Sequence, residues 1–170
     1  MTMQISTTAG FTRITQIPFD VDAGIAGRAR IGLIVLATDH TMEYEYRQVV
    51  TLPGVAFYES RIPNSPTITP ETLRQMASHI ADQASVILPG MPLDVVAYGC
   101  TASALKTPHE VTRDEIAAEL DLPTVTTMGS VLEAFRALGV KSVAVGSPYT
   151  DDINEAERRY FESQGLTVTA

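Results

Sequence analysis

An uninterrupted apolar segment, Ile31-Gly32-Leu33-Ile34-Val35-Leu36, constrains the fold of this chain more than any other feature. A run of this length between polar residues is typical of a strand that is buried on both faces of a parallel sheet. The segment Met42 to Val50 follows, with Glu43 and Glu45 near its start, where acidic side chains favour the beginning of a helix. The ordered part of the chain therefore begins, at about residue 28, with a strand, loop and helix unit.

Segments of the same kind follow along the chain, and strand candidates alternate with helix candidates. Further strands are expected at 55–58, 93–98, 124–126 and 142–146, and further helices at 70–88, 108–120 and 130–138. Thr69 and Pro70 suit the cap and the first position of the helix at 70–88. This alternation predicts an α/β fold, in which helices cover both faces of a parallel sheet.

An internal similarity suggests two lobes. The segment Lys141 to Thr150 resembles the segment Arg30 to Asp39, and each is followed by an acidic helix and a further strand. A two-strand piece cannot bury both faces of its sheet, so either another chain completes the second lobe or residues are missing. We expect an irregular arm over 1–27, a first α/β lobe over 28–139 and an incomplete second lobe over 140–170, in a truncated or proteolysed chain.

The charge balance and the hydropathy limit the kinds of partner and the cellular location that we expect for this protein. Twelve Lys and Arg against twenty Asp and Glu give a net charge of −8, and no basic patch stands out, so nucleic acid is not an expected partner. No window approaches the roughly 18 consecutive apolar residues of a membrane span. The first 24 residues lack the basic start and apolar run of a secretory signal. We therefore expect a cytoplasmic protein that binds neither membranes nor nucleic acid.

Small polar residues follow three of the strand candidates, at 38–41, 99–103 and 147–150. Ligands of open parallel sheets bind beyond the carboxyl ends of the strands, so these segments predict a site. Cys100 is the single cysteine and cannot form an internal disulfide. Gly99 lets the backbone turn tightly, and the amides of Thr101 and Ala102 at the next helix start would favour a thiolate or face an anion. We expect a reactive thiol rather than a buried apolar residue.

Structural roles also suit several of these residues. Asp39 and Thr41 are suitable caps for the helix that starts near Met42. Tyr149 could pack under Pro148 as a loop aromatic. The chain has no Gly-rich phosphate fingerprint, no serine nucleophile elbow and no clustered Cys and His, which disfavours nucleotide, serine-hydrolase and metal sites.

An ordered set of segments resembles a known superfamily. The segments are Ile31 to Val35 with Asp39, Thr41 and Glu43, then Thr69-Pro70-Glu71, Val95 to Thr101, Pro123 to Thr127, Ala137 to Ala144, and Pro148-Tyr149. Together they cover about residues 30–170 and resemble the aspartate/glutamate racemase superfamily. Within it, the branch that contains maleate cis-trans isomerase and arylmalonate decarboxylase is the most similar.

The resemblance implies two pseudo-symmetric flavodoxin-like lobes, a site between them without cofactor or metal, and one catalytic cysteine from each lobe. Cys100 matches the first-lobe cysteine, which the isomerase has and the decarboxylase lacks. Tyr149 matches a tyrosine that helps to hold the substrate carboxylate or the intermediate. The pattern differs at Asp39, where the isomerase has Asn, and at Leu73, where the decarboxylase has tyrosine. The second-lobe cysteine is absent from this sequence.

The sequence therefore predicts a cofactor-independent isomerase or racemase, most like maleate cis-trans isomerase, that acts on a small carboxylate or dicarboxylate. A non-catalytic carboxylate-binding module and an arylmalonate-type decarboxylase are the alternatives. We expect a homo-oligomer, and little turnover by these 170 residues without a second cysteine. The predicted site consists of catalytic Cys100 and, for substrate binding, Asp39, Thr41, Thr101, Ala102, Tyr149 and Thr150.

Overall fold

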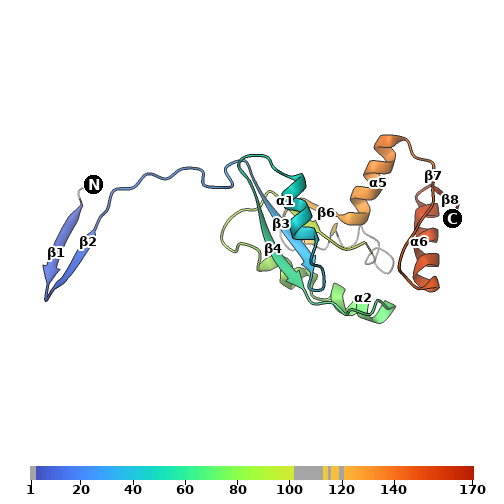
Figure 1. Ribbon diagram of the computed structural model, residues 1–170, viewed down its shortest axis with the longest axis horizontal. Coiled ribbons are helices and arrows are strands. Elements are labelled where there is room, and N and C mark those ends of the chain that lie inside the picture. The colour runs from blue at the N-terminus through green and yellow to red at the C-terminus, as the bar shows by residue number, and fades with distance from the viewer. Residues whose placement is uncertain (1–2, 102–112, 115, 119–120) are drawn as a thin grey trace.

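A four-stranded parallel sheet lies at the centre of the computed structural model, which describes residues 3–101, 113–114, 116–118 and 121–170 (Figure 1). The strand order is β4-β3-β5-β6, so β3, which carries the apolar run of the sequence, lies inside the sheet. The strands are β3 (Ala29–Leu36), β4 (Val55–Ile62), β5 (Val95–Tyr98) and β6 (Thr124–Thr126). The predicted α/β class and the parallel sheet are confirmed.

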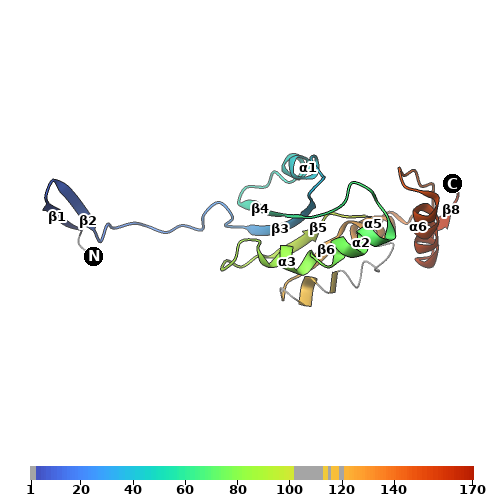
Figure 2. The ribbon, with the colours of Figure 1, turned by 90° about the horizontal axis from the view of Figure 1, so that it is seen from below.

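Helices cover both faces of this sheet (Figure 2). Helix α1 (Met42–Val49) packs on one face, where Met42 and Tyr46 contact Leu33 and Val35 of β3. Helices α2 (Pro70–Ala77) and α3 (Ile80–Ser85) pack on the other face. The larger core lies there, and its buried members include Ile34, Ile62, Leu73, Met76, Ile80, Ala84, Ile87 and Val96. Alternate residues of β3 thus supply the two cores, as expected for a strand buried on both sides.

The helix expected over 70–88 is instead two helices. Thr69 caps α2 as predicted, since its hydroxyl accepts a hydrogen bond from the amide of Thr72 at 3.2 Å. The first helix ends at Ala77, and the hydroxyl of the following Ser78 donates to the carbonyl of Gln75 at 2.8 Å and so competes with the helical pattern. The apolar stripe continues across the break, because Met76 and Ile80 are both buried in one core.

Strand β4 is longer than expected, because it pairs with β3 over all eight residues. Its last part alternates between polar and buried residues: Glu59 and Arg61 lie on one side, and Ser60 and Ile62 are buried on the other. The expected strand stopped at Tyr58 because the charged residues hide this period of two. The helix expected over 108–120 falls mostly outside the described residues.

A second strand, helix and strand unit follows the central sheet. Helix α5 (Thr127–Leu138) ends at Gly139, whose φ of 67° is the left-handed conformation that closes many helices. Strands β7 (Ser142–Val143) and β8 (Thr167–Val168) form a parallel pair and flank α6 (Asp151–Ser163). A separate apolar cluster joins α5 to this unit, with Met128, Leu132 and Phe161 buried.

The N-terminal segment differs from the irregular arm that the sequence suggests. Strands β1 (Gln4–Thr8) and β2 (Phe11–Thr15) form an antiparallel hairpin in full register. An extended segment connects the hairpin to β3 and places it far from the sheet (Figure 1). The two strands of the hairpin are connected by a turn at Ala9-Gly10, and both of these residues have positive φ.

No helix in the described ranges is long and apolar enough to cross a membrane.

Candidate functional site

A cavity of about 290 Å³ opens where the strands of the central sheet end. Its walls come from the loop after β3, the segment after β4, the first turns of α2, the end of β5 and the loop before α6. Polar residues in the lining are Thr38, Asp39, Asn64, Ser65, Thr72, Cys100, Thr101, Thr127 and Tyr149, and Leu36, Met42, Ile68, Leu73 and Met76 supply its apolar surface. The structure thus brings all three predicted strand-end segments to one place.

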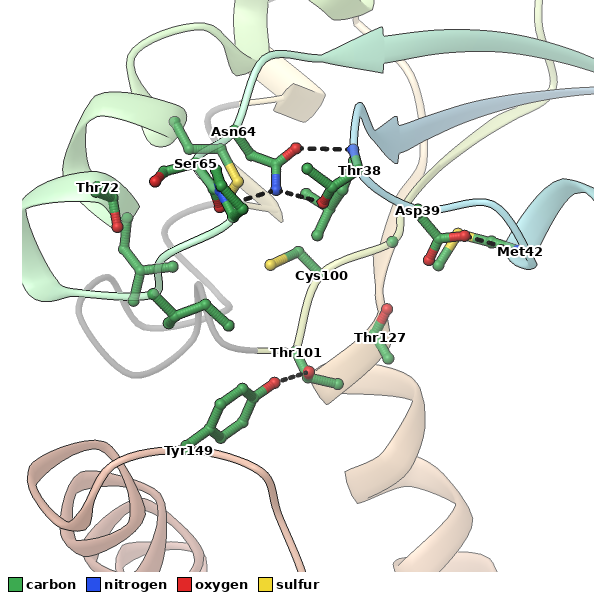
Figure 3. Close-up of a pocket in the computed structure, with 16 residues that line it drawn as sticks. Thr38, Asp39, Met42, Asn64, Ser65, Thr72, Cys100, Thr101, Thr127 and Tyr149 are labelled. Atoms are coloured by element: carbon green, nitrogen blue, oxygen red, sulfur yellow. Dashed lines mark hydrogen bonds between the residues drawn. The ribbon is translucent and has the colours of Figure 1, made fainter.

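Cys100 lies two residues after the end of β5 and points into this cavity (Figure 3). It is 6% exposed, so the sulfur lies in a mostly desolvated position. The preceding Gly99 is closely packed, because a Cβ atom there would meet the end of the Met42 side chain, which would have to move, and would lie 3.3 Å from the carbonyl oxygen of Ile34. Its φ is not positive, so the tight turn that the sequence suggests is not the reason for glycine here.

Asp39 lines the cavity but directs its carboxylate to the start of α1 (Figure 3). One carboxylate oxygen accepts hydrogen bonds from the amides of Thr41 and Met42, both at 2.8 Å. Although partial burial opposes the shift, these amide bonds and the nearby His40 hold the pKa of Asp39 below its usual value. The carboxylate is therefore ionised near neutral pH and bonded to the helix terminus.

Tyr149 and Thr101 meet on the wall nearest α6. Their hydroxyl oxygens are 3.3 Å apart, and both residues line the cavity. Asn154 of α6 supports this wall, since its side-chain amide donates to the carbonyl of Tyr149 at 3.1 Å. The hydroxyl of Ser147 bonds both the Asn154 side chain and the Tyr149 amide. The loop before α6 is thereby held against the end of β5.

Thr38 and Asn64 form the opposite wall (Figure 3). The side-chain amide of Asn64 donates to the hydroxyl of Thr38 at 2.8 Å, and its oxygen accepts from the Thr38 amide at 3.1 Å. These paired bonds join the segment after β4 to the loop after β3. Among the described residues that line the cavity, Asp39 alone is charged at neutral pH, so neutral hydroxyl and amide groups dominate the polar surface around Cys100.

The remaining predicted site residues lie differently. Thr41 and Thr150 do not line the cavity: the hydroxyl of Thr41 is 3.5 Å from the Asp39 carboxylate, and that of Thr150 bonds Asp152. Thr41 and Thr150 precede α1 and α6 directly. Ala102 lies outside the described residues. A role for these three residues in substrate binding stays a prediction.

Five polar lining residues were not among the predicted site residues: Thr38, which lies in one of the predicted strand-end segments, and four residues outside those segments, Asn64, Ser65, Thr72 and Thr127. The sequence did carry a signal for Asn64 and Ser65, because they follow the end of β4 just as the predicted residues follow the ends of their strands. The expected strand ended four residues too early to expose it. Thr127 begins α5 directly after β6, and its hydroxyl donates to the carbonyl of Tyr98 at 3.2 Å.

Among the residues that the structure describes, no group of three or more His, Cys, Asp or Glu side chains is arranged to hold a metal ion.

Comparison with known proteins agrees with this fold. The family model of arylmalonate decarboxylase matches residues 67–170. The chain is 26% identical over 159 residues to a maleate isomerase of Geobacillus stearothermophilus, covering 85% of this chain and 63% of the relative. It is 29% identical over 153 residues to a maleate isomerase of Nocardia farcinica, covering 84% and 61%. The chain thus spans about three fifths of the length of these curated relatives.

A solved structure is similar to most of the chain. It is a cysteine-to-serine variant of the Nocardia farcinica maleate cis-trans isomerase with a covalently bound succinylcysteine intermediate. The match has a TM-score of 0.75 at 26% identity and covers 83% of this chain and 61% of that chain.

The sheet and the cysteine at its strand ends belong to an α/β protein that these matches place in the aspartate/glutamate racemase superfamily. Within that superfamily, the chain belongs to the arylmalonate decarboxylase family, in the branch that also contains the maleate isomerases.

Proposed function

We propose that this protein is a cytoplasmic, cofactor-independent isomerase of a small unsaturated dicarboxylate, most like maleate cis-trans isomerase, with Cys100 as its nucleophile. The observation that carries the proposal is the position of the thiol. Cys100 points into a cavity of about 290 Å³ between two walls of neutral hydrogen-bonding groups. A cavity of this size suits a substrate of a few carbon atoms.

The addition step uses one thiolate. The sulfur adds to one carbon of the double bond, and the electron pair of that bond moves to the neighbouring carbon and its carboxylate, which becomes an enediolate. The former double bond is then single and can rotate. Return of the electron pair restores the double bond in the trans arrangement and expels the thiolate. A succinylcysteine, as named for the Nocardia farcinica variant, is the product of the same addition when the enediolate takes up a proton.

The walls of the cavity supply what the intermediate needs. Negative charge grows on a carboxylate during the addition, and hydroxyl donors already in place stabilise it without reorganisation. Thr101 and Tyr149 offer such hydroxyls on one side of the sulfur. The carboxylate of Asp39 is bonded to the amides of α1, which reduces its repulsion of an anionic substrate.

Decarboxylation of a malonate is the second candidate, because the matching family model bears that description. A thiol in this position would then protonate the enediolate that remains after loss of carbon dioxide. Leu73 lines the cavity where the decarboxylase pattern has tyrosine, and this difference favours isomerisation. Racemisation ordinarily needs a group on each face of a planar intermediate, and Cys100 would supply one of the two.

Trapping the adduct tests the proposal directly. The chain is incubated with maleate, quenched in acid and analysed by intact mass and peptide mapping, while NMR follows the conversion of maleate to fumarate. We expect a succinyl adduct on Cys100 and none in Cys100→Ser, and little turnover by these 170 residues alone. In a longer version that supplies the second lobe and its cysteine, Cys100→Ser should lower turnover by orders of magnitude, because a serine hydroxyl is far less ionised than a thiol near neutral pH. Phenylmalonate is the parallel substrate. Carbon dioxide release from phenylmalonate with no reaction of maleate would establish the decarboxylase instead, and unchanged turnover in Cys100→Ser of the longer, active version would refute both candidates.

A further inference from the structure

The bonds between Asn64 and Thr38 give the cavity a hydroxyl group of fixed orientation. A backbone amide can only donate, so the oxygen of the Asn64 side chain must face the Thr38 amide, 3.1 Å away. The nitrogen of the same side chain then faces the Thr38 hydroxyl, 2.8 Å away, and donates to its oxygen. The direction of both hydrogen bonds is therefore set by chemistry.

This direction leaves the hydroxyl hydrogen of Thr38 available. Among the described residues, the Thr38 oxygen accepts from Asn64 and donates to no protein acceptor. Thr38 is exposed and lines the cavity. A hydroxyl that already accepts one hydrogen bond is polarised, which makes it a better donor to a second group. An anionic ligand in the cavity would be such a group.

The position of this donor relative to the thiol completes the argument. Cys100 lies between the Thr38 and Asn64 wall and the wall formed by Thr101 and Tyr149 (Figure 3). A four-carbon dicarboxylate that places one carboxylate at each wall would present its central carbon atoms to the sulfur. A monocarboxylate could use only one wall at a time.

We propose that Asn64 is a positioning residue that orients the Thr38 hydroxyl toward the second carboxylate of the substrate, and that this pair makes the site prefer dicarboxylates to monocarboxylates. The inference rests on the proposed function, since it assumes a carboxylate substrate beside Cys100. It assigns to the segment after β4 a role in specificity that acts through the loop after β3.

Alkylation of the single cysteine provides a readout that does not depend on turnover. The rate at which iodoacetamide modifies Cys100 is measured by intact mass at increasing concentrations of succinate or butyrate, neither of which has a double bond to react. For the unmodified chain, we expect succinate to protect at roughly tenfold lower concentration than butyrate, the effect of one additional hydrogen bond to a charged group. The same measurement is made on Asn64→Ala, Thr38→Val, Thr38→Ser and the double variant Asn64→Ala with Thr38→Val.

The variants distinguish a positioning role of Asn64 from a role in stabilising the fold. Asn64→Ala and Thr38→Val should each remove most of the advantage of succinate and leave protection by butyrate within about twofold, while Thr38→Ser keeps the advantage. If Asn64 acts through the Thr38 hydroxyl, the double variant should lose no more of the succinate advantage than either single variant does. Thermal unfolding of each variant reports its stability, and Thr38→Val keeps the test open if Asn64→Ala does not fold.

Two results would overturn this inference and leave the proposed function standing. One is a full succinate advantage in Asn64→Ala or Thr38→Val. The other is a double variant in which the losses of succinate advantage from the two single variants multiply. A different result bears on the proposed function. If neither succinate nor butyrate slows alkylation of the unmodified chain, the cavity does not bind small carboxylates, and the proposed function and this inference both fail.

Discussion

The first and the last strand, helix and strand units of the chain share a local pattern but are held together differently. In the first, β3 and β4 pair over eight residues, and β3 also pairs with β5. In the last, β7 and β8 pair over two residues. The helices show the opposite trend, since α1 has no buried residue whereas α6 buries Ile153, Glu157 and Phe161.

The comparison shows that the same order of strand, helix and strand can be stabilised by two different kinds of packing. The first unit depends on its strands, which lie between the cores of two helical layers. The last depends on its helix, which contacts the main core through Ile153 and the α5 cluster through Phe161. Both units reach the cavity, because the loop after β3 carries Thr38 and the loop after β7 leads to Tyr149.

Truncating matched valines in β3 and β7 should give the largest difference. Val35 is fully buried, so Val35→Ala removes two methyl groups from a closed core and should lower the free energy of unfolding by about 2 kcal/mol or more. Val143, in β7, is half-buried, and Val143→Ala should cost less than about 1 kcal/mol. Urea denaturation monitored by circular dichroism measures both. Equal losses would contradict the difference in packing between the units.

The helix starts differ as well, with a smaller expected effect. Asp39 bonds two amides at the start of α1, so Asp39→Ala should cost about 1 kcal/mol. Thr150, at the start of α6, makes no side-chain cap bond, and Thr150→Ala should cost a few tenths of a kcal/mol at most. The measurement is again urea denaturation, and a larger loss at Thr150 would reverse the comparison.

The charge of Asp39 adds a pH dependence to this comparison. Its pKa is lower in the folded chain than the ordinary 3.8, so the folded state binds fewer protons and ionised Asp39 stabilises it above that value. This contribution is lost as the pH falls through the folded pKa. The advantage of Asp39 over Asp39→Asn should therefore be complete at pH 6 and shrink below about pH 4.

Glu157 gives α6 a buried carboxylate that α1 lacks. One of its oxygens is buried with no hydrogen-bond partner among the described residues, and burial raises its pKa above the ordinary 4.5. The folded state therefore binds more protons, and stability decreases as the pH rises above 4.5. Glu157→Gln should stabilise the protein by about 1 kcal/mol at pH 7 and by nothing at low pH.

A matched control comes from α1, where Glu45 is exposed in the first turn. Glu45→Gln should change stability by a few tenths of a kcal/mol at most and in the destabilising direction, because it removes negative charge from a helix start. Thermal unfolding between pH 4 and 8 measures both variants. A Glu157→Gln variant that is less stable at pH 7 would show that the carboxylate is favourably bonded.

Surface arginines should show the smallest effects. Arg158 bonds Glu155 and Glu162 on the exposed face of α6 and helps to lower the pKa of Glu155 to about 2. Arg61 of β4 instead joins separate elements, since it bonds Glu43 of α1 and the carbonyl of Asp39. Arg158→Ala should change the melting temperature by an amount close to measurement error and less still in high salt. Arg61→Ala should cause the larger shift, and the reverse order would contradict the comparison.

Much of the site was predictable because it follows from strand ends. Cys100, Thr101, Tyr149 and Asp39 were all expected, and all line the cavity. Asn64 was not expected, because Glu59 and Arg61 conceal the second half of an edge strand whose period of two is visible only once β3 pairs with it. The N-terminal hairpin was also missed, since its register depends on the turn at Ala9-Gly10 rather than on a buried face.

The sequence by itself determined the features that depend on near neighbours in the chain. Burial and capping select residue types locally, so short stretches of consecutive residues are enough to predict these features. They are the apolar run of β3, the cap at Thr69 and the helix end at Gly139. The Asp39 carboxylate likewise bonds amides two and three residues further along the chain. Tertiary structure decided which way the side chain of Asn64 faces, and that Gly99 lies against the carbonyl of Ile34 in β3. Those choices depend on hydrogen bonds and contacts between elements far apart in sequence, which form only when the sheet assembles.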